Sequence, residues 1–444
     1  MNDETLVSTP QKTAVSHPTQ DDTQISLMSN KMTHYLITSL LLNNSLRNKV
    51  IKLTQEKKKA LAPELGIDIR KLIRISSLLD AREKKYQNIF TFIIGVASVV
   101  LFLDFGYELA VLVVSWIILA FVYLDKLNVE NNWLLGLVKD KKSYALAWFE
   151  QTLENNYGAK IPSRPVPGPN QNLVVYDGFV PFVGAGLNIG GWSFPINISH
   201  PREDMGQTTE IKAFTFSELY SAIEQMLRKC EFTGFAACDF LFVNGSQVRD
   251  FDWILPNIAK PPITYVGTEC VEKYRDENDP TIRYYKWMRI QDQRNDLLLS
   301  YFFRFSKRGE YLFVEVNRFL LLPLASRYRI VDDVQEPTTF DEEVGALIGK
   351  IINSLIVAPF VAIRSIFGVI GRSYSVIADM DLFGNKERKM EAKMKKDRTF
   401  NYGSRTTLRK EVSSNSYEHY FLKLDKEMYV QVFEKQFLEA LVNF

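Results

Sequence analysis

Two apolar stretches separated by a short polar break dominate the sequence between residues 89 and 123. They read IFTFIIGVASVVLFL and LAVLVVSWIILAFVY, with DFGYE between them. At about 1.5 Å per residue, each stretch is slightly shorter than a hydrocarbon core about 30 Å thick. Tyr86, Tyr107 and Tyr123 can extend the stretches to interface depth. Both are apolar on every face, which favours a membrane over a buried helical hairpin in a soluble domain. The pattern predicts a transmembrane hairpin over residues 88–124.

Basic residues surround this hairpin but are missing from its turn, which carries only Asp104 and Glu108. Six precede the first stretch and four follow the second, namely Arg70, Lys71, Arg74, Arg82, Lys84 and Lys85, then Lys126, Lys139, Lys141 and Lys142. Lys and Arg beside membrane helices stay on the cytoplasmic side. The sequence therefore predicts a protein of the cell inner (cytoplasmic) membrane with both termini cytoplasmic.

Composition divides the remainder of the chain into segments. The first 25 residues are polar and lack an apolar signal segment, so a disordered tail is expected there. A cluster of prolines near residue 165 indicates an extended linker. The expected order is a tail at 1–25, cytoplasmic helices at 26–87, the hairpin at 88–124, a helix at 125–158, the linker at 159–171, a domain at 172–332, a helix at 339–377 and a C-terminal segment at 378–444.

The segment at 172–332 mixes strand patterns with helix patterns. GWSFPINI, ACDFLFVNG, DLLLSYFFRF and YLFVEVNRFLLLP are strand-like, whereas FSELYSAIEQMLRK predicts a helix with Ser217 as its N-cap. Most strands have neighbours close in sequence, which favours antiparallel pairing. The predicted fold is an α+β membrane protein with N-terminal helices, a two-helix transmembrane hairpin, a cytoplasmic, largely antiparallel α+β domain and C-terminal amphipathic helices. The last of these is expected to dock on the α+β domain.

A long apolar helix pattern at 339–377 is interrupted by Lys350, Pro359 and Arg364. An arginine near the bilayer centre is costly, so the pattern favours an amphipathic helix at the membrane interface or against the hairpin. A third span and an ordinary core helix are the alternatives, and whether residues 343–370 enter the membrane stays open. The basic run that follows indicates either contact with anionic lipid or a solvated helix, through Lys386, Arg388, Lys389, Lys393, Lys395 and Lys396.

The stretch VGAGLNIGGWSF contains four glycines, Gly184, Gly186, Gly190 and Gly191. Their spacing differs from the dinucleotide fingerprint G-x-G-x-x-G, and a strand pattern containing Pro195 follows where a helix N-terminus would be needed. We therefore expect a tight strand connection, or a loop lying against another backbone. A role of these glycines in binding a ligand stays open.

One set of residues could support nucleophilic catalysis. Ser193 and His200 lie close in sequence, and Asp177 lies upstream, which are the residue types of a nucleophile, a base and an orienting acid. Against this reading, Pro195 replaces the final glycine of G-x-S-x-G, and Ser193 points to solvent if Trp192 faces the core. No triad spacing supports the set.

Composition argues against other classes of function. The formal net charge is +2, so no overall basic field indicates binding to nucleic acid. Three cysteines fit a reducing compartment, and neither they nor the four scattered histidines have the spacing of a zinc site. The sequence therefore predicts neither a bound metal nor a cofactor.

Together with the short hairpin, the stretches YDGFVPFVGAGLNIGGWSF and FNYGSRTTLRKEVSS resemble a family of uncharacterised bacterial membrane proteins common in actinobacteria. The resemblance covers most of the chain after residue 60. It implies a membrane location and brings no catalytic residue with it.

Three hypotheses for function follow. The first is a membrane-anchored, non-enzymatic protein whose cytoplasmic domain binds a ligand or a protein partner, as a sensor or effector. The second is a membrane-surface hydrolase that uses Ser193 and His200. The third is an oligomeric, membrane-disrupting effector of the pore type, for example in phage defence. In all three the lipid bilayer is a partner. The third requires a homo-oligomer that forms through the hairpin, whereas the other two leave oligomerisation open.

Overall fold

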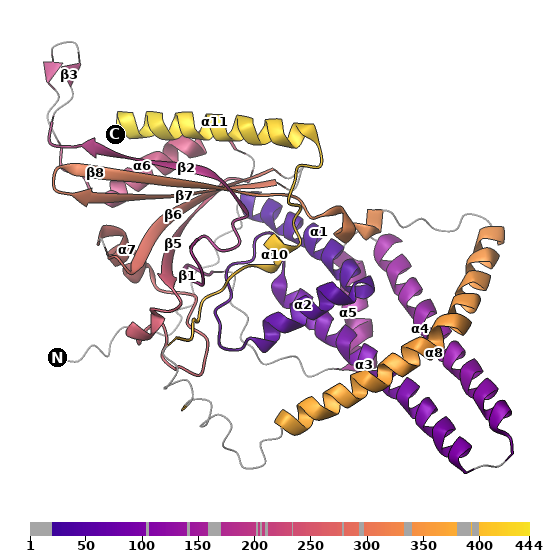
Figure 1. Ribbon diagram of the computed structural model, residues 1–444. Coiled ribbons are helices and arrows are strands. Elements are labelled where there is room, and N and C mark those ends of the chain that lie inside the picture. The colour runs from indigo at the N-terminus through magenta and orange to yellow at the C-terminus, as the bar shows by residue number, and fades with distance from the viewer. Residues whose placement is uncertain are drawn as a thin grey trace.

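The computed structural model describes residues 20–103, 106–139, 143–158, 170–200, 203–204, 207–208, 212–232, 234–277, 279–292, 297–332, 340–379, 392 and 399–444. The basic residues expected to contact lipid, most of the proline-rich linker and residues 1–19 of the expected tail lie outside them. The last residues of that tail already belong to the first helix, which begins at Gln20. Figure 1 shows long helices on one side of the molecule and an α+β domain on the other.

Five helices form the N-terminal part: α1 (Gln20–Leu42), α2 (Asn44–Gln55), α3 (Ile69–Phe102), α4 (Glu108–Lys139) and α5 (Ser143–Tyr157). Side-chain caps start two of them, because Asn43 accepts from the amide of Leu46 at 3.1 Å and Asp68 from that of Arg70 at 3.1 Å. The helices share an apolar core that also takes in Tyr328 from the α+β side. This core joins the two parts of the molecule.

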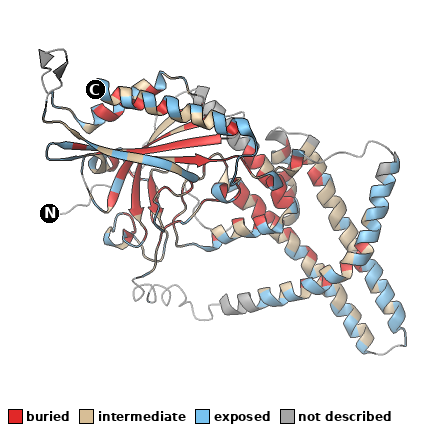
Figure 2. Ribbon diagram, turned by 45° about the horizontal axis from the view of Figure 1, so that its top comes forward, coloured by how far each residue is buried: buried red, intermediate tan, exposed pale blue. Residues whose placement is uncertain are grey.

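Helices α3 and α4 lie antiparallel, and buried charges fix their base. Arg82 is only 2% exposed, and its guanidinium lies 2.8 Å from Glu130, while Lys126 lies 2.8 Å from Glu83. Beyond this base the outer ends, residues 91–102 and 108–118, project from the molecule, and many of their large apolar residues are exposed (Figure 2). We call these ends the helix tips. Asp104, in the expected turn, lies outside the described residues.

Three helices are long and apolar enough to cross a membrane: α3, α4 and α8 (Phe340–Asp379). Both views show α8 crossing α3 and α4 near the base of the helix tips (Figures 1 and 2). Ala358 is buried in one cluster with Phe90 and Leu119, and Arg372 donates to Asn88 at 3.1 Å. Between Ala358 and Arg372, α8 advances by about 21 Å along its axis. The α3 residues near these two positions, Phe90 and Asn88, lie within one helical turn of each other. The crossing is therefore steep.

The α+β domain is built on a six-stranded mixed sheet with the order β1-β5-β6-β7-β8-β2. The strands are β1 (Leu173–Tyr176), β2 (Leu187–Asn197), β5 (Ala236–Asn244), β6 (Ile282–Asp292), β7 (Leu297–Arg308) and β8 (Tyr311–Leu321). Only the β1–β5 pair is parallel among these neighbours, which confirms the predicted α+β class. A separate small hairpin consists of β3 (Glu203–Asp204) and β4 (Gln207–Thr208).

Three helices cover one face of this sheet: α6 (Phe216–Arg228), α7 (Thr268–Asp276) and α11 (Tyr420–Asn443). Helix α6 starts from a capping box of Thr215 and Glu218, two residues before the predicted cap at Ser217. Helix α11 packs on the sheet, and the rings of Phe433 and Tyr301 stack with centroids 3.6 Å apart. We call this side the helix-covered face.

The opposite face is covered only in part. At one end an aromatic cluster forms around Phe182, whose ring stacks on Phe302 with centroids 4.3 Å apart. Short elements complete the domain: η1 (Val248–Asp250), η2 (Ser326–Tyr328), η3 (Ile330–Asp332) and α10 (Leu408–Glu411). The chain before α10 runs beside β1, where the Ser404 amide donates to the Val175 carbonyl at 2.9 Å. We call this second side the open face.

Candidate functional site

The residues expected to form a catalytic set lie apart in the fold. Asp177 directly follows β1 and Ser193 lies within β2, so they sit at opposite edges of the six-stranded sheet. Five strand spacings of about 4.8 Å separate those edges by about 24 Å. His200 is exposed and lies beyond the end of β2. The three side chains therefore do not form a hydrogen-bonded triad.

Asp177 has structural partners instead. Its carboxylate accepts from Arg405 Nε at 2.8 Å and from Asn401 Nδ2 at 3.0 Å, and it lies 3.6 Å from Lys59 Nζ. These contacts fasten the C-terminal segment and the loop before α3 to the end of β1. The aspartate thus stabilises the junction between distant segments.

Ser193 occupies the open face, as the alternation along β2 predicts. Trp192 packs towards the helix-covered face and donates to Glu434 Oε1 at 3.1 Å. Ser193 therefore points the other way, where it is exposed and stands directly opposite Glu315 of β8. It belongs to a polar row that runs across the open face.

Two of the four glycines, Gly186 and Gly191, lie against backbone atoms, and Gly184 and Gly190 lie against side chains. Gly186 has φ +106°, and a Cβ there would lie 2.1 Å from the carbonyl oxygen of Leu320. A Cβ on Gly191 would lie 2.5 Å from the carbonyl oxygen of Val316. Gly184 has φ +83° and lies against the side chain of Thr407, while Gly190 has φ +108° at a β-bulge. These contacts account for the glycines without a ligand.

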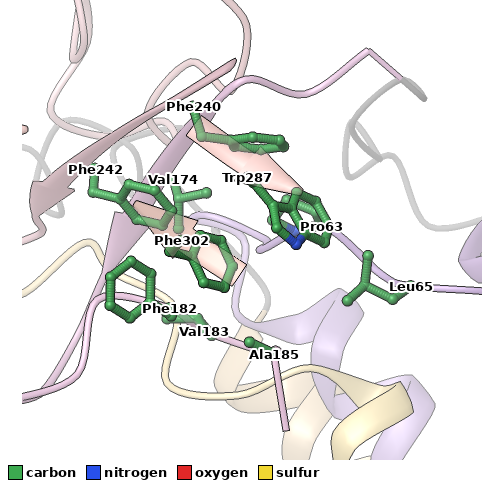
Figure 3. Close-up of a pocket in the computed structure, with 10 residues that line it drawn as sticks. All are labelled: Pro63, Leu65, Val174, Phe182, Val183, Ala185, Phe240, Phe242, Trp287 and Phe302. Carbon is green, nitrogen blue, oxygen red and sulfur yellow. The ribbon is translucent and has the colours of Figure 1, made fainter. Parts of the chain in front are cut away.

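Figure 3 shows a small cavity inside the aromatic cluster of the open face. Its volume is about 20 Å³, and its lining is Pro63, Leu65, Val174, Phe182, Val183, Ala185, Phe240, Phe242, Trp287 and Phe302. A space of this size holds one water at most, and an apolar lining gives a water too few partners. We regard it as a packing cavity.

A larger groove opens where the aromatic cluster ends. Its volume is about 440 Å³, and it is lined by Asp279, Pro280, Arg283, Arg304, Ser306, Arg308, Tyr311, Phe313 and Glu315. We call it the arginine groove. Arg304, Ser306 and Arg308 alternate along β7, directly opposite Glu315, Phe313 and Tyr311 of β8. Directly opposed residues share a face, so the pairing places these side chains side by side on the open face.

The acidic groups of the arginine groove already accept hydrogen bonds. Glu315 Oε1 accepts from Tyr285 Oη at 2.9 Å and from Asn317 Nδ2 at 2.9 Å. Asp279 accepts from the amides of Thr281 and Ile282 at 2.6 and 2.9 Å. Among the residues that the structure describes, Arg283 and Arg308 make no ion pair. The groove therefore presents cationic groups to solvent.

Another ionisable group of note lies at the junction of the two parts. The carboxylate of Glu64 accepts from the amides of Leu408 and Arg409 at 2.7 and 3.0 Å. Burial raises the pKa of Glu64 to about 7. Within the described ranges, no group of three His, Cys, Asp or Glu side chains is arranged to hold a metal ion.

Sequence reasoning missed the arginine groove because its residues come from three strands. A signal was present in SYFFRFSKRGEYLF, where polar residues alternate along β7 with apolar residues that face the other side of the sheet. Recognising it as a groove requires the pairing of β6, β7 and β8, which the sequence does not state.

Comparison with known proteins gives one result. A family model described as an AbeC-like domain matches residues 191–444, which is more than half of the chain. The match begins at Gly191 within β2, covers the rest of the sheet except β1 together with α8 and α11, and leaves out the N-terminal helices. No curated protein and no solved structure matches.

Proposed function

The chain belongs to the AbeC-like domain family, and we propose that it is a membrane-anchored, non-enzymatic protein whose cytoplasmic domain binds a ligand. In this proposal α3 and α4 form a transmembrane hairpin, and the α+β domain is the part that senses or transmits a signal. Apolar helices of this length are compatible with a membrane location.

The observation that carries the proposal is the apolar surface of the helix tips. Large apolar side chains stand exposed around both helices, among them Phe92, Val96, Val99, Phe102, Leu109, Leu112, Val113, Val114, Ile117 and Ile118. Soluble proteins rarely expose contiguous apolar patches of more than a few hundred Å². A bilayer core takes up such a surface at no cost, and helical hydrogen bonding satisfies the backbone within it.

The charge distribution supports a cytoplasmic α+β domain. Basic residues lie at the base of the hairpin, where Lys84 and Lys85 of α3 are exposed and Lys126 of α4 pairs with Glu83. Gly106 to Glu108, the described part of the turn, carries no positive charge. Because positive residues stay on the cytoplasmic side, this asymmetry favours both termini there.

The geometry of α8 supports a helix that lies along the membrane surface. It crosses α3 and α4 steeply at the base of the tips, where a surface helix would lie. Arg364 is exposed between the exposed apolar residues Ile363 and Phe367. A membrane span would turn this arginine toward lipid, which costs several kcal/mol, about 2.5–3.5 on insertion scales. At the interface its guanidinium can reach headgroups and water.

Substitutions on the helix tips test the anchoring. We expect the double variant Val99→Lys/Ile117→Lys to move from the membrane fraction to the soluble or aggregated fraction after carbonate washing. A lysine within these apolar segments costs up to about 2.5–3.5 kcal/mol, the full cost applying at the bilayer centre. Phe179→Lys, at an exposed apolar residue of the α+β domain, is the matched control and should stay in the membrane. Retention of the double variant in the membrane would refute the proposed anchor.

A second candidate is a membrane-disrupting effector of the abortive-infection type. An AbeC-like domain together with apolar helices fits such an effector. It would require the hairpins of several copies to assemble in the bilayer. Overexpression of the full chain should then arrest growth and admit a membrane-impermeant dye, and Val99→Lys/Ile117→Lys should abolish both effects. Dye exclusion during expression favours the anchored binding protein.

A further inference from the structure

We propose that the arginine groove binds a nucleotide, with its phosphate on Arg283, Arg304 and Arg308 and its base on Tyr311 and Phe313. The proposal deepens the proposed function, on which it rests, by naming the class of ligand and the face that takes it.

Three arginine side chains line this one groove. Arg304 and Arg308 project from alternate positions of β7, and Arg283 lines the same groove from β6. Arginine presents its N–H donors in a fork that matches phosphate oxygens, and charge-assisted bonds of this kind are the strong ones. With three arginines against Asp279 and Glu315, the lining keeps one net positive charge. An anionic phosphate group is attracted to this excess of positive charge.

The aromatic side chains supply a surface for a planar ring. Tyr311 is 51% exposed and Phe313 is 40% exposed, and both project from β8 on the open face. Aromatic rings exposed beside cationic groups are the usual platform on which nucleic-acid bases stack. The groove volume of about 440 Å³ falls within the 300–1,000 Å³ range of small-molecule sites.

The position of the groove favours a soluble ligand over a lipid headgroup. The groove lies toward the β7–β8 turn, at the end of the sheet that carries β3 (Figure 1). The helix tips lie at the opposite end of the molecule (Figure 1). A membrane that holds the tips therefore does not reach this part of the open face.

Calorimetric titration of the full chain in detergent micelles tests the proposal, with AMP, adenosine and inorganic phosphate as separate ligands. We expect AMP to bind, phosphate to compete with it weakly, and adenosine to bind at least tenfold more weakly than AMP. Arg283→Ala/Arg308→Ala should weaken AMP binding by about tenfold or more, because each charge-assisted contact contributes substantially. Tyr311→Ala should weaken binding of AMP but leave that of phosphate unchanged.

Lys307→Ala is the matched control, because Lys307 is an exposed cation on the same strand that points to the other face. It should bind AMP like the unaltered protein. Failure of AMP to bind, equal binding of adenosine and AMP, or binding indifferent to the arginine substitutions would overturn the proposal. The proposal would also be overturned if the arginine substitutions weakened binding to phosphatidylglycerol vesicles but did not weaken binding of AMP. The groove substitutions should not change retention in the membrane. Membrane anchoring and nucleotide binding can therefore fail independently of each other.

Discussion

The indole nitrogen of Trp116 lies 2.7 Å from the carbonyl oxygen of Leu355, to which it donates a hydrogen bond. Leu355 stands four residues before Pro359, the proline inside α8. In an unbroken helix the amide of residue 359 would donate to this carbonyl, but proline has no N–H. Trp116 of α4 therefore supplies the donor that α8 lacks, and it couples the two helices where they cross.

A double-mutant cycle tests this coupling. Trp116→Phe should lower the stability of the detergent-solubilised protein by about 1 kcal/mol, because the Leu355 carbonyl loses its donor. In a Pro359→Ala background the helix itself provides a donor, so the same substitution should cost clearly less. The measurement is unfolding in SDS or urea for all four proteins. Equal costs in the two backgrounds would show that the bond does not compensate for the proline.

Glu64, at the junction of the two parts, should make the stability of the folded protein depend on pH. The folded protein holds the pKa of Glu64 at about 7, above its ordinary value of 4.5, because burial disfavours the charged carboxylate. The folded state therefore binds more protons between these values, so stability should fall as the pH rises from about 4.5 through 7. Glu64 is partly accessible to solvent in the folded protein, and solvent screening reduces the effect, so we expect a loss of about 2 kcal/mol.

The control for this prediction is Glu64→Gln, which keeps an oxygen that accepts from the Leu408 amide but cannot ionise. Thermal unfolding between pH 5 and pH 8 should show a smaller decline for this variant than for the unaltered protein. Identical slopes for the two proteins would assign the pH dependence to other groups.

Alanine substitutions at two glycines of positive φ distinguish the stability cost of backbone strain from that of a steric clash. Gly186→Ala places a methyl group 2.1 Å from the Leu320 carbonyl oxygen, so β2 and β8 must move apart, and we expect a loss of at least about 3 kcal/mol. Gly178 has φ +120° with open space where an alanine methyl group would lie, and Gly178→Ala should cost only about 1–2 kcal/mol of strain. Thermal unfolding compares the two. A Gly186→Ala variant as stable as Gly178→Ala would contradict the close approach.

The two ends of α8 should lie on the same side of the membrane. Gly345 and Ser373 are both exposed near opposite ends of the helix. In a chain from which Cys230, Cys238 and Cys270 have been replaced by alanine, Gly345→Cys and Ser373→Cys should both react with a membrane-impermeant maleimide in inverted vesicles only. Labelling of the two positions from opposite sides would make α8 a third span.

The features that could be predicted best from the sequence are those that depend on residues close together in the chain. The apolarity of α3 and α4 is a local property, so the two apolar stretches and the basic residues at their base could be recognised directly. The α+β class followed from strand patterns. Helix α8 was expected to be amphipathic, yet it is also long and apolar enough to span, and the sequence could not show that Trp116 and Ala358 meet at the crossing.

Distant strand pairing explains what the sequence could not predict. Asp177 and Ser193 are near neighbours in the chain, but β2 pairs with β8 more than a hundred residues later, which moves them to opposite edges of the sheet. The same pairing sets Ser193 opposite Glu315 and aligns Arg304 of β7 with it. The groove depends on this register, which no local pattern specifies.

The sidedness of two positions tests the central claim most directly. In the same cysteine-free background, Tyr107→Cys marks the turn between the helix tips and Ser193→Cys marks the open face, where both native side chains are exposed. A membrane-anchored protein with a cytoplasmic domain predicts that an impermeant maleimide added to intact spheroplasts labels position 107 but reaches position 193 only after permeabilisation. Labelling of both positions from the same side would contradict the account.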